Sequence, residues 1–288
     1  MQDLNYQLKN ICKHNKDGSF ATQSARQRNL DLMANQLREL GFHHLNATSL
    51  KPKHVIALVA HWKQSSIALG TIKNRMAHLR WWAEKIGKPN IIPPTNLALN
   101  IDNRTYVTNQ SKAISLEPSA LEKIPDPNIK ISLELQAAFG LRREEALKFQ
   151  PSFADRQDKI VLKSSWCKGG QEREVPILND YQRDVLARAH KIAGRGSLIP
   201  PTLKYIQHLK RYERACQNAN LSKVHGLRHA YAQSRYKQLT GRDSPSCGGL
   251  TSKQLSLEEK EIDLKARLII SEELGHHREE ITAVYLGR

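Results

Sequence analysis

Residues 225–232 read HGLRHAYA, and the interpretation of the whole chain starts from this stretch. His225 and Arg228 are three residues apart, so both can face one ligand from the start of a helix. His229 follows four residues after His225, a spacing also found in zinc proteases, but Gly226 stands where their catalytic glutamate would be. The stretch therefore speaks against a metal site, and we expect His229 to be a packing or capping residue.

Four further segments carry side chains of matching chemistry. Counted with Arg228 and His225, the chain offers two arginines that can neutralise a phosphodiester, a lysine and two histidines that can move protons, and a tyrosine that can attack phosphorus.

Taken singly, each residue has an ordinary explanation. Arg142 could form a surface ion pair with Glu145, Lys168 could be an exposed turn residue, and the histidines and the tyrosine could be packing residues. Together they favour DNA cleavage and rejoining without metal. The segments are GLRREEAL (140–147) with Arg142, CKGGQER (167–173) with Lys168, ELGHH (273–277) with His276 and AVYLGR (283–288) with Tyr285.

The composition favours a polyanionic partner. The chain has 288 residues, enough for one large or two ordinary domains, and its formal net charge is +17. Residues 1–110 hold 15 Lys and Arg against 6 Asp and Glu, and the remainder holds 30 against 22. Because both parts are basic, both could contact the same duplex, and double-stranded DNA is the expected partner. A basic protein without a nucleic-acid role is the alternative.

The sequence lacks the patterns of secreted, metal-binding and membrane proteins. Cys12, Cys167, Cys216 and Cys247 form no CxxC pair and no zinc-ligand spacing, so we expect reduced thiols. The N-terminus has no apolar signal region, and no window approaches 18 apolar residues. We therefore expect a cytoplasmic protein that needs no metal and no cofactor.

The first hundred residues are predicted to form helices, because apolar residues recur at steps of three and four in three stretches. The third helix opens near Thr71 and stops at Gly87, and the face opposite its apolar stripe is basic. That face could lie on a DNA backbone, with Lys73, Arg75 and Arg80 as contacts, or it could simply be solvated. The three stripes cover 30–40, 55–62 and 72–86.

A break separates these helices from the second half of the chain. Residues 88–118 contain prolines and little periodicity, so we predict a linker over 96–116 between domains at 1–95 and 117–288. The predicted fold class is mainly α with a small antiparallel β-sheet. The expected later elements are helices near 119–123 and 129–139, strands near 160–162 and 175–177 around a Gly-Gly turn, and helices after Tyr181 except in a loop at 241–253.

Taken together, the motifs resemble the tyrosine recombinases, the phage-integrase-like family of site-specific DNA recombinases. GLRREEAL resembles the family's first arginine motif, CKGGQEREVPI its β-hairpin lysine motif, and HGLRHAYA its His-x-x-Arg motif. ELGHHREEITAVYLGR matches the closing Leu-Gly-His to Tyr motif, with His276 and Tyr285 at the family's spacing. SIALGTIKNRMAHLRWWAEKIG is similar to the helical, SAM-like core-binding domain. The resemblance extends from about residue 22 to residue 285.

The resemblance implies a clamp of two domains on duplex DNA and a mechanism without cofactor. Tyr285 would attack a phosphate, forming a 3′-phosphotyrosyl bond and releasing a 5′-hydroxyl. Lys168 would protonate the leaving oxygen, His225 would assist proton transfer, and Arg173 on the outgoing strand would contact the DNA backbone. The implied catalytic residues are Arg142, Lys168, His225, Arg228, His276 and Tyr285.

The same resemblance implies a biological setting: a dimer on each site, a tetramer at synapsis, and integration or excision of a mobile element in a bacterium, on the nucleoid. A DNA-bending accessory protein could be a further partner. Two alternatives stay open, a resolvase of chromosome dimers and an architectural DNA-binding protein or repressor without catalysis. The presence of all six catalytic side-chain types speaks against the second.

Three features depart from the family's pattern. The chain ends three residues after Tyr285, which puts docking of a C-terminal tail on a neighbouring subunit in doubt. The segment at about 240–270 is longer than usual and could supply a contact between protomers, or be a simple surface insertion. Gln171 stands where relatives often carry a second basic residue, which could weaken contacts of the hairpin to DNA.

Overall fold

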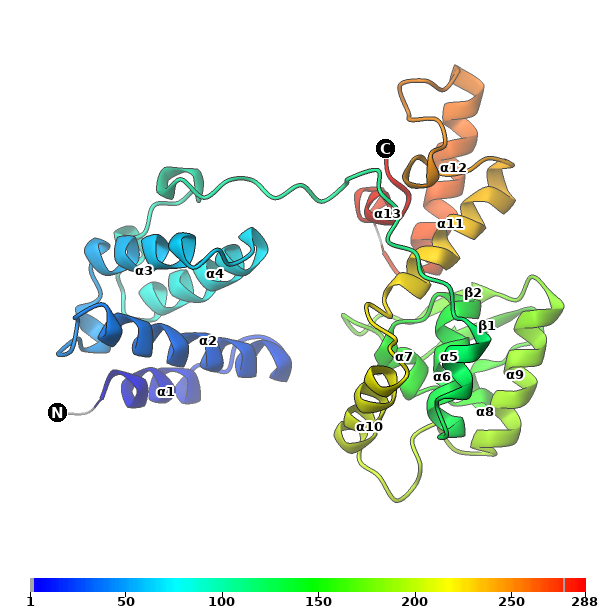
Figure 1. Cartoon of the computed structure of the whole chain (residues 1–288), viewed down its shortest axis with the longest axis horizontal. Helices are drawn as coiled ribbons and strands as arrows, with labels where there is room; N and C mark the ends of the chain where they lie inside the picture. The colour runs from blue at the N-terminus through cyan, green and yellow to red at the C-terminus, as the bar shows by residue number, and fades with distance from the viewer. Residues whose placement is uncertain (1–2, 277) are drawn as a thin grey trace. The chain divides into compact units, whose positions relative to one another are not determined.

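The computed structural model of the chain describes residues 3–276 and 278–288, and His277 of the closing motif lies outside the described residues. The chain divides into two compact units, Met1–Thr105 and Tyr106–Arg288. Figure 1 shows helices in both units and the short strands in the second. In the described part of the chain, no helix is both long and apolar enough to cross a membrane.

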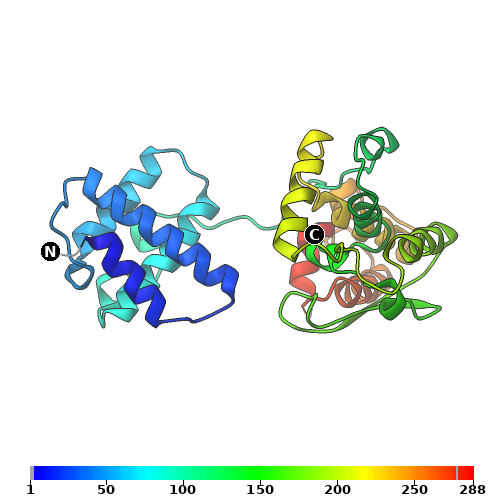
Figure 2. The same ribbon diagram turned by 90° about the horizontal axis from the view of Figure 1, so that it is seen from below.

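The first unit is built from four helices around one apolar core. The α1 helix lies along α2 (Figures 1 and 2). Two indole groups are buried in the core with their N–H groups satisfied, because Trp62 donates to Gln36 and Trp82 donates to the carbonyl of Ala47, both at 2.9 Å. The four helices are α1 (Leu4–His14), α2 (Phe20–Glu39), α3 (Pro52–Gln64) and α4 (Leu69–Lys85), with short 3₁₀ turns at Ala47–Ser49, Pro89–Ile91 and Leu97–Leu99.

The predicted apolar stripes face this core except at Leu40, which follows the end of α2 and is exposed, and one predicted helix start is also corrected. Proline begins α3, where its missing N–H costs no helical hydrogen bond. The α4 helix begins at Leu69 rather than near Thr71, because Ala68 occupies the capping position. Thr71 is therefore an exposed residue of the first turn. The stripe of α4 is buried as expected at Ile72 and Met76.

The connection between the units packs onto each of them at its ends. Ile101 belongs to the core of the first unit and is 1% exposed. Ile114 packs against an apolar cluster of the second unit, and its N–H donates to the carbonyl of Gly226 at 3.3 Å. Between these two anchors, Asn109 pairs with the backbone of Arg288, and Ser111 donates to Gln233.

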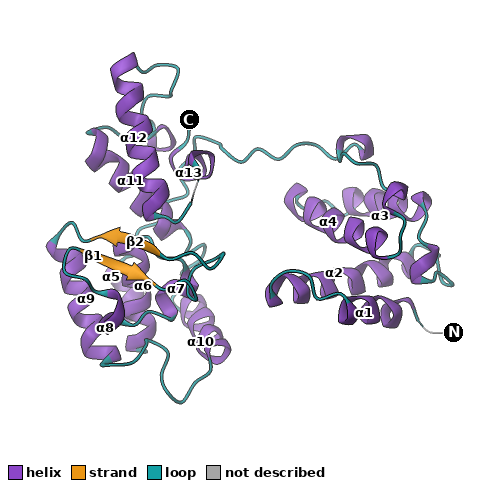
Figure 3. Ribbon diagram, turned by 180° about the vertical axis from the view of Figure 1, so that it is seen from behind, coloured by secondary structure: helices purple, strands orange, loops and turns teal. Residues whose placement is uncertain are grey.

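The second unit surrounds a two-stranded antiparallel sheet with helices (Figure 3). Lys159 pairs with Pro176 and Leu162 pairs with Arg173, so the hairpin predicted from sequence is present. The strands are β1 (Lys159–Leu162) and β2 (Arg173–Pro176). The helices are α5 (Pro118–Glu122), α6 (Pro127–Phe139), α7 (Arg143–Leu147), α8 (Pro151–Ala154), α9 (Asp180–Ala193), α10 (Tyr205–Asn218), α11 (Gly226–Thr240), α12 (Leu257–Glu273) and α13 (Glu279–Leu286), with a 3₁₀ turn at Pro245–Cys247.

One expectation for this unit is corrected. Residues 194–204 form turns instead of continuing the helical pattern after Tyr181, because Gly194 ends α9 and two adjacent prolines follow at 200 and 201. Near the C-terminus, Leu274 caps the end of α12, and α13 starts at Glu279. The core beneath the site joins α6, the hairpin, α9, α11, α12 and α13.

Candidate active site

Arg228 is the most deeply buried charged residue of the predicted set. It lies in the first turn of α11, which His225 precedes at the capping position, and it is 1% exposed. Its guanidinium donates to the carbonyls of Gly140 and Leu274. Gly140 ends α6 in the left-handed region, with φ +59°, which turns its backbone toward α11. Two separate helix ends therefore hold Arg228 in place.

Arg142 is held by its own neighbour and by the end of α12. Its Nη1 donates to Glu145 at 2.8 Å and its Nη2 donates to the carbonyl of Leu274 at 3.1 Å. Glu145 also accepts the N–H of Arg142 at 2.6 Å, which caps the start of α7. Arg143 points elsewhere and pairs with Glu213 near the surface. Arg142 and Glu145 thus pair as their spacing allows, but Glu145 is fully buried, so the pair is not the surface ion pair of the ordinary explanation.

His276 follows a turn that only glycine fits well. The N–H of His276 donates to Ser271 and that of Gly275 to Glu272, both at 2.7 Å, the pattern of a Schellman helix end. Gly275 has φ +60°, and a Cβ there would lie 2.5 Å from Cδ of Arg173. The turn places Nε2 of His276 3.4 Å from Nη2 of Arg228.

Tyr285 of α13 completes the cluster. Its hydroxyl lies 3.2 Å from Nε2 of His225 and 3.4 Å from Nε of Arg228. The ring of His276 stacks on the tyrosine at 5.4 Å between centroids, and that of His229 lies 4.4 Å away. His229 is buried, so its expected packing role fits its position. The phenol oxygen of Tyr285 thus lies within hydrogen-bonding distance of His225 and Arg228, and the rings of His229 and His276 pack against the tyrosine ring.

Two residues that sequence reasoning missed hold the backbone of the tyrosine. Gln233 donates to the carbonyl of Tyr285 at 3.0 Å, and Ser246 donates to the same oxygen at 3.1 Å. Gln233 lies two turns after His225 on α11, so the helical period could have indicated it. Ser246 lies in the loop predicted at 241–253, where no pattern marked it.

The electrostatics of the site depend on burial and three guanidiniums. Burial lowers the pKa of His276 to about 3 and that of Arg228 to about 10, and the neighbouring guanidiniums add to both shifts. His225 is exposed as a residue, but the protein around its ring partly desolvates it and lowers its pKa, and the charges of Arg228 and Arg142 add to this shift. Burial would raise the pKa of Glu145, but Arg173 and Arg228 oppose it and hold the pKa at about 2. Near pH 7 the histidines are therefore neutral and Glu145 is ionised.

Lys168 is not part of this cluster. It is exposed in the connection between β1 and β2, and it makes no hydrogen bond or ion pair to the other predicted catalytic residues that the structure describes. The preceding residue, Cys167, is buried, and burial together with the charge of Glu145 raises the pKa of its thiol. The connection, residues 163–172, is therefore buried near Glu145 at Cys167 and exposes the next residue, Lys168, to solvent.

The described residues include no group of three or more His, Cys, Asp or Glu side chains arranged to hold a metal ion. Residues 1–92 match the family described as phage integrase, N-terminal, and residues 104–234 match the family described as integrase. The chain belongs to the tyrosine recombinase family. The matches include Arg142 and Arg228 but end before His276 and Tyr285, whose placement comes from the structure alone.

Solved structures of tyrosine recombinases share the fold. A lambda integrase dimer bound to a COC′ core site superposes with a TM-score of 0.64 at 14% identity, covering 99% of this chain and 78% of that one. The XerH recombinase on palindromic difH has a TM-score of 0.61 at 15% identity, with 99% and 81% covered. The Tn1549 transposon integrase with circular intermediate DNA has a TM-score of 0.58 at 14% identity, with 100% and 96% covered. No curated protein sequence matches this tyrosine recombinase.

The predicted DNA contacts of the first unit are partly engaged within the protein. Arg80 donates to the carbonyl of Pro93 at 3.1 Å, and Lys73 donates to Asn103 at 3.5 Å. The guanidinium of Arg75 lies over the ring of a buried tryptophan, 5.5 Å from its centroid. All three side chains are partly exposed, so a role in DNA binding stays a prediction.

Arg173 requires a correction. It was expected to contact the DNA backbone from the outgoing strand, but its side chain is 4% exposed and donates to Glu145 at 2.5 Å and to the carbonyl of Glu273. Side chains alternate between the two faces of a strand, so the sequence alone does not say which face Arg173 occupies. In the structure it lies on the buried face, where Glu145 accepts its hydrogen bond. Arg173 therefore lies beneath the cluster instead of at the surface.

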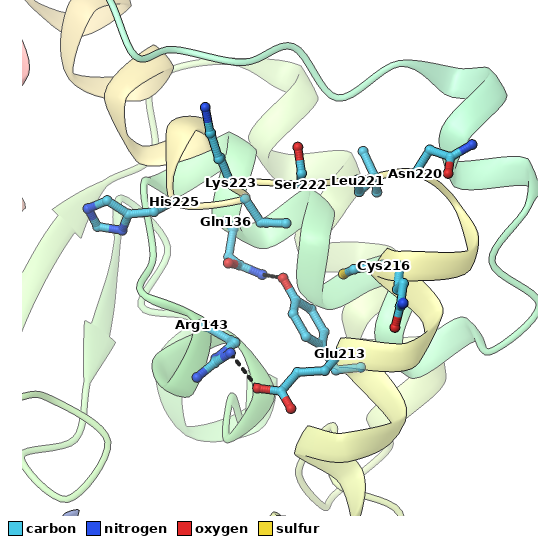
Figure 4. Close-up of a pocket in the computed structure, with 12 residues that line it drawn as sticks. Gln136, Arg143, Glu213, Cys216, Asn220, Leu221, Ser222, Lys223 and His225 are labelled. Carbon is cyan, nitrogen blue, oxygen red and sulfur yellow. Dashed lines mark hydrogen bonds and ion pairs between the residues drawn. The ribbon is translucent and has the colours of Figure 1, made fainter. Parts of the chain in front are cut away.

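A surface cavity of about 750 Å³ borders the site in this tyrosine recombinase (Figure 4). It lies between α10 and the segment leading to α11, and it is lined by an ion pair between Arg143 and Glu213 and a hydrogen bond between Gln136 and Tyr212. Of the predicted catalytic residues it includes only His225. The reacting groups thus meet beside this cavity, not in it.

Proposed function

We propose that this protein is a site-specific DNA recombinase that cuts and rejoins duplex DNA through a 3′-phosphotyrosyl intermediate. The observation that carries the proposal is the position of the Tyr285 hydroxyl, within hydrogen-bonding distance of both His225 and Arg228. Any buried hydroxyl needs a hydrogen-bond partner, but these two partners also supply what a phenol nucleophile requires: the imidazole can accept its proton, and the guanidinium can stabilise negative charge.

The residues divide the chemistry among themselves. The phenol oxygen of Tyr285 attacks phosphorus, the bond from phosphorus to the 5′-oxygen breaks, and the leaving oxygen takes a proton from Lys168. His225, neutral near pH 7, accepts the phenol proton at 3.2 Å. Arg142 and Arg228 neutralise the developing charge on the nonbridging oxygens. Attack by a 5′-hydroxyl reverses these steps, so rejoining needs no nucleotide cofactor.

The partly exposed edge of the cluster is where a phosphate enters. Arg142 is partly exposed and His225 is exposed, whereas Arg228, His276 and Tyr285 are buried. A bound phosphate would replace the backbone carbonyl that both arginines now share as acceptors. Its negative charge would also raise the pKa of both histidines. Lys168 reaches the leaving oxygen only if the connection that carries it folds toward DNA.

We assign double-stranded DNA as the partner, a dimer on each site, and a tetramer at synapsis. The solved relatives include a lambda integrase dimer on a core site and a lambda integrase tetramer on a Holliday junction, which supports this assignment. The lambda integrase and the Tn1549 transposon integrase also support integration or excision of a mobile element as the role. A bacterial nucleoid is the place of action that we propose with it. A DNA-bending accessory protein is part of the same proposal.

The test is covalent trapping on nicked duplexes tiled across the DNA that flanks the gene. The expected product is a protein–DNA band on a denaturing gel that disappears in Tyr285→Phe. As a matched control, Tyr181→Phe alters an exposed tyrosine of α9 and should leave the band intact. Tight binding of the tiles without any covalent band would overturn the proposal and favour an architectural DNA-binding protein.

A further inference from the structure

Arg173 links three parts of the site that are far apart in sequence. It is the first residue of β2, and its guanidinium donates to Glu145 at 2.5 Å and to the carbonyl of Glu273. Its aliphatic stem lies against Gly275 so closely that a Cβ there would come within 2.5 Å. The residue thus contacts the start of α7, the end of α12 and the turn that leads to His276.

The groups that Arg173 contacts are those that hold the proposed catalytic side chains. Glu145 uses its other oxygen to bind Nη1 of Arg142 at 2.8 Å. The turn at Gly275 sets the position of His276, and the preceding carbonyl of Leu274 accepts from Arg142 and Arg228. A displacement of Arg173 would therefore change the positions of the Arg142 guanidinium and the His276 imidazole, the two groups that would face the phosphate.

Stability alone is a weak reason for this arrangement. Removing a guanidinium and a carboxylate from water is costly, and an apolar pair of similar volume often stabilises a core as well or better. What an apolar pair cannot do is set the direction of hydrogen bonds to a carboxylate and to a helix-end carbonyl. The side chains of Arg173 and Glu145 are 4% and 0% exposed, so their hydrogen bonds go to other groups of the protein and not to water.

We propose that Arg173 is a positioning residue that couples the β-hairpin to the placement of Arg142 and His276, an inference that rests on the proposed recombinase chemistry. Lys168 lies on the connection that ends at Arg173, five residues earlier in the chain. When that connection docks on DNA, Arg173 therefore moves with it and aligns Arg142 and His276 with the phosphate. The hairpin does more than carry the general acid.

The experiment compares Arg173→Lys and Arg173→Met in the full chain. The control is Arg235→Met, which removes another largely buried guanidinium. Arg235 pairs with the side-chain carboxylate of Glu273 at 2.9 Å, whereas Arg173 donates to the backbone carbonyl of Glu273. Cleavage of nicked duplex is measured in single turnover, and DNA affinity by gel shift. We expect Arg173→Met to lower the cleavage rate about 100-fold with affinity unchanged, because small misplacements of catalytic groups cost that much. Arg173→Lys should recover part of the rate, and Arg235→Met should retain it.

The pH profile separates positioning from general destabilisation. Glu145 faces Arg142, Arg173, Arg228 and the thiol of Cys167, and its pKa of about 2 keeps it ionised. Without Arg173, fewer guanidiniums oppose the effect of burial and the pKa of Glu145 rises, so the loss of cleavage on the acid side should begin at a higher pH in Arg173→Met than in the parent chain. An unchanged profile together with an unchanged rate would overturn the proposal.

A second measurement does not depend on cleavage. The NMR signals of the Arg142 guanidinium and the His276 ring should shift in Arg173→Met and stay in place in Arg235→Met. Absence of covalent product from the parent chain would count against the proposed function, and these signals would still decide the coupling. Unshifted signals in a folded Arg173→Met protein would refute the positioning role even if the parent chain cleaves DNA.

Discussion

Replacing Glu145 by glutamine tests the electrostatic centre of the site. The carboxylate is fully buried and accepts three hydrogen bonds: from Nη1 and the N–H of Arg142 and from Nη2 of Arg173. Glutamine keeps the shape but turns one acceptor oxygen into a donor, which then faces a guanidinium. The substitution also leaves the buried charge of Arg173 without its carboxylate.

The size of the effect follows from the ionisation of Glu145. Its pKa is about 2 in the folded protein and 4.5 ordinarily. At about 1.4 kcal/mol for each pH unit, ionised Glu145 contributes about 3 kcal/mol to folding near pH 7. Removal of one partner of a buried ion pair typically lowers the free energy of unfolding by about 3–5 kcal/mol, which agrees with the value from the pKa. We expect Glu145→Gln to lower the free energy of unfolding by about 3 kcal/mol and Tm by about 6–12 °C.

The assay is urea unfolding of the full chain, with Glu144→Gln on the same helix as control. Glu144 is half exposed and pairs with Lys148, so its loss should cost less than about 1 kcal/mol. Because the folded pKa of Glu145 is depressed, its contribution is present above pH 4.5 and is lost as pH falls toward 2. The gap between parent and Glu145→Gln should therefore narrow below pH 4.5. A cost below 1 kcal/mol at pH 7, or a gap independent of pH, would refute the reasoning.

Three further substitutions address the nucleophile and its supports. His225→Ala should slow covalent complex formation on the order of 100-fold with DNA affinity unchanged, because Tyr285 loses its proton acceptor; single-turnover cleavage measures this. Gly275→Ala should destabilise the protein by about 2 kcal/mol, since it combines φ +60° with a clash against Arg173, and thermal unfolding measures this. Gln233→Leu should cost about 1 kcal/mol and slow cleavage, because the carbonyl of Tyr285 loses one of its two donors.

Each of these expectations has a contrary outcome. A His225→Ala protein that cleaves at the parent rate would remove His225 from proton transfer. An unaltered Tm for Gly275→Ala would mean that the turn relaxes without strain. Normal cleavage by a destabilised Gln233→Leu protein would show that the residue supports the fold and not the nucleophile.

Local features of the structure were predictable from sequence because they depend on backbone periodicity. The apolar stripes of α2, α3 and α4 face the first core, and Gly140 ends α6 in the left-handed region. Arg142 and Glu145 are three residues apart, so their contact needs only one helical turn. The order of the motifs along the chain also indicates the family.

Contacts between distant segments were decided only by the tertiary structure. The hydroxyl of Tyr285 meets Arg228 across 57 positions, and Arg173 meets the carbonyl of Glu273 across 100, through the packing of α11, α12, α13 and the hairpin. Alternation along a strand allows two faces for Arg173, and the burial of Glu145 selected the inner one. The sequence by itself therefore determined which chemical groups the chain carries. The tertiary structure determined which carbonyl, carboxylate or phenol oxygen each guanidinium binds. Hydrogen bonds depend on distances between segments far apart in the chain, and no local sequence pattern encodes those distances.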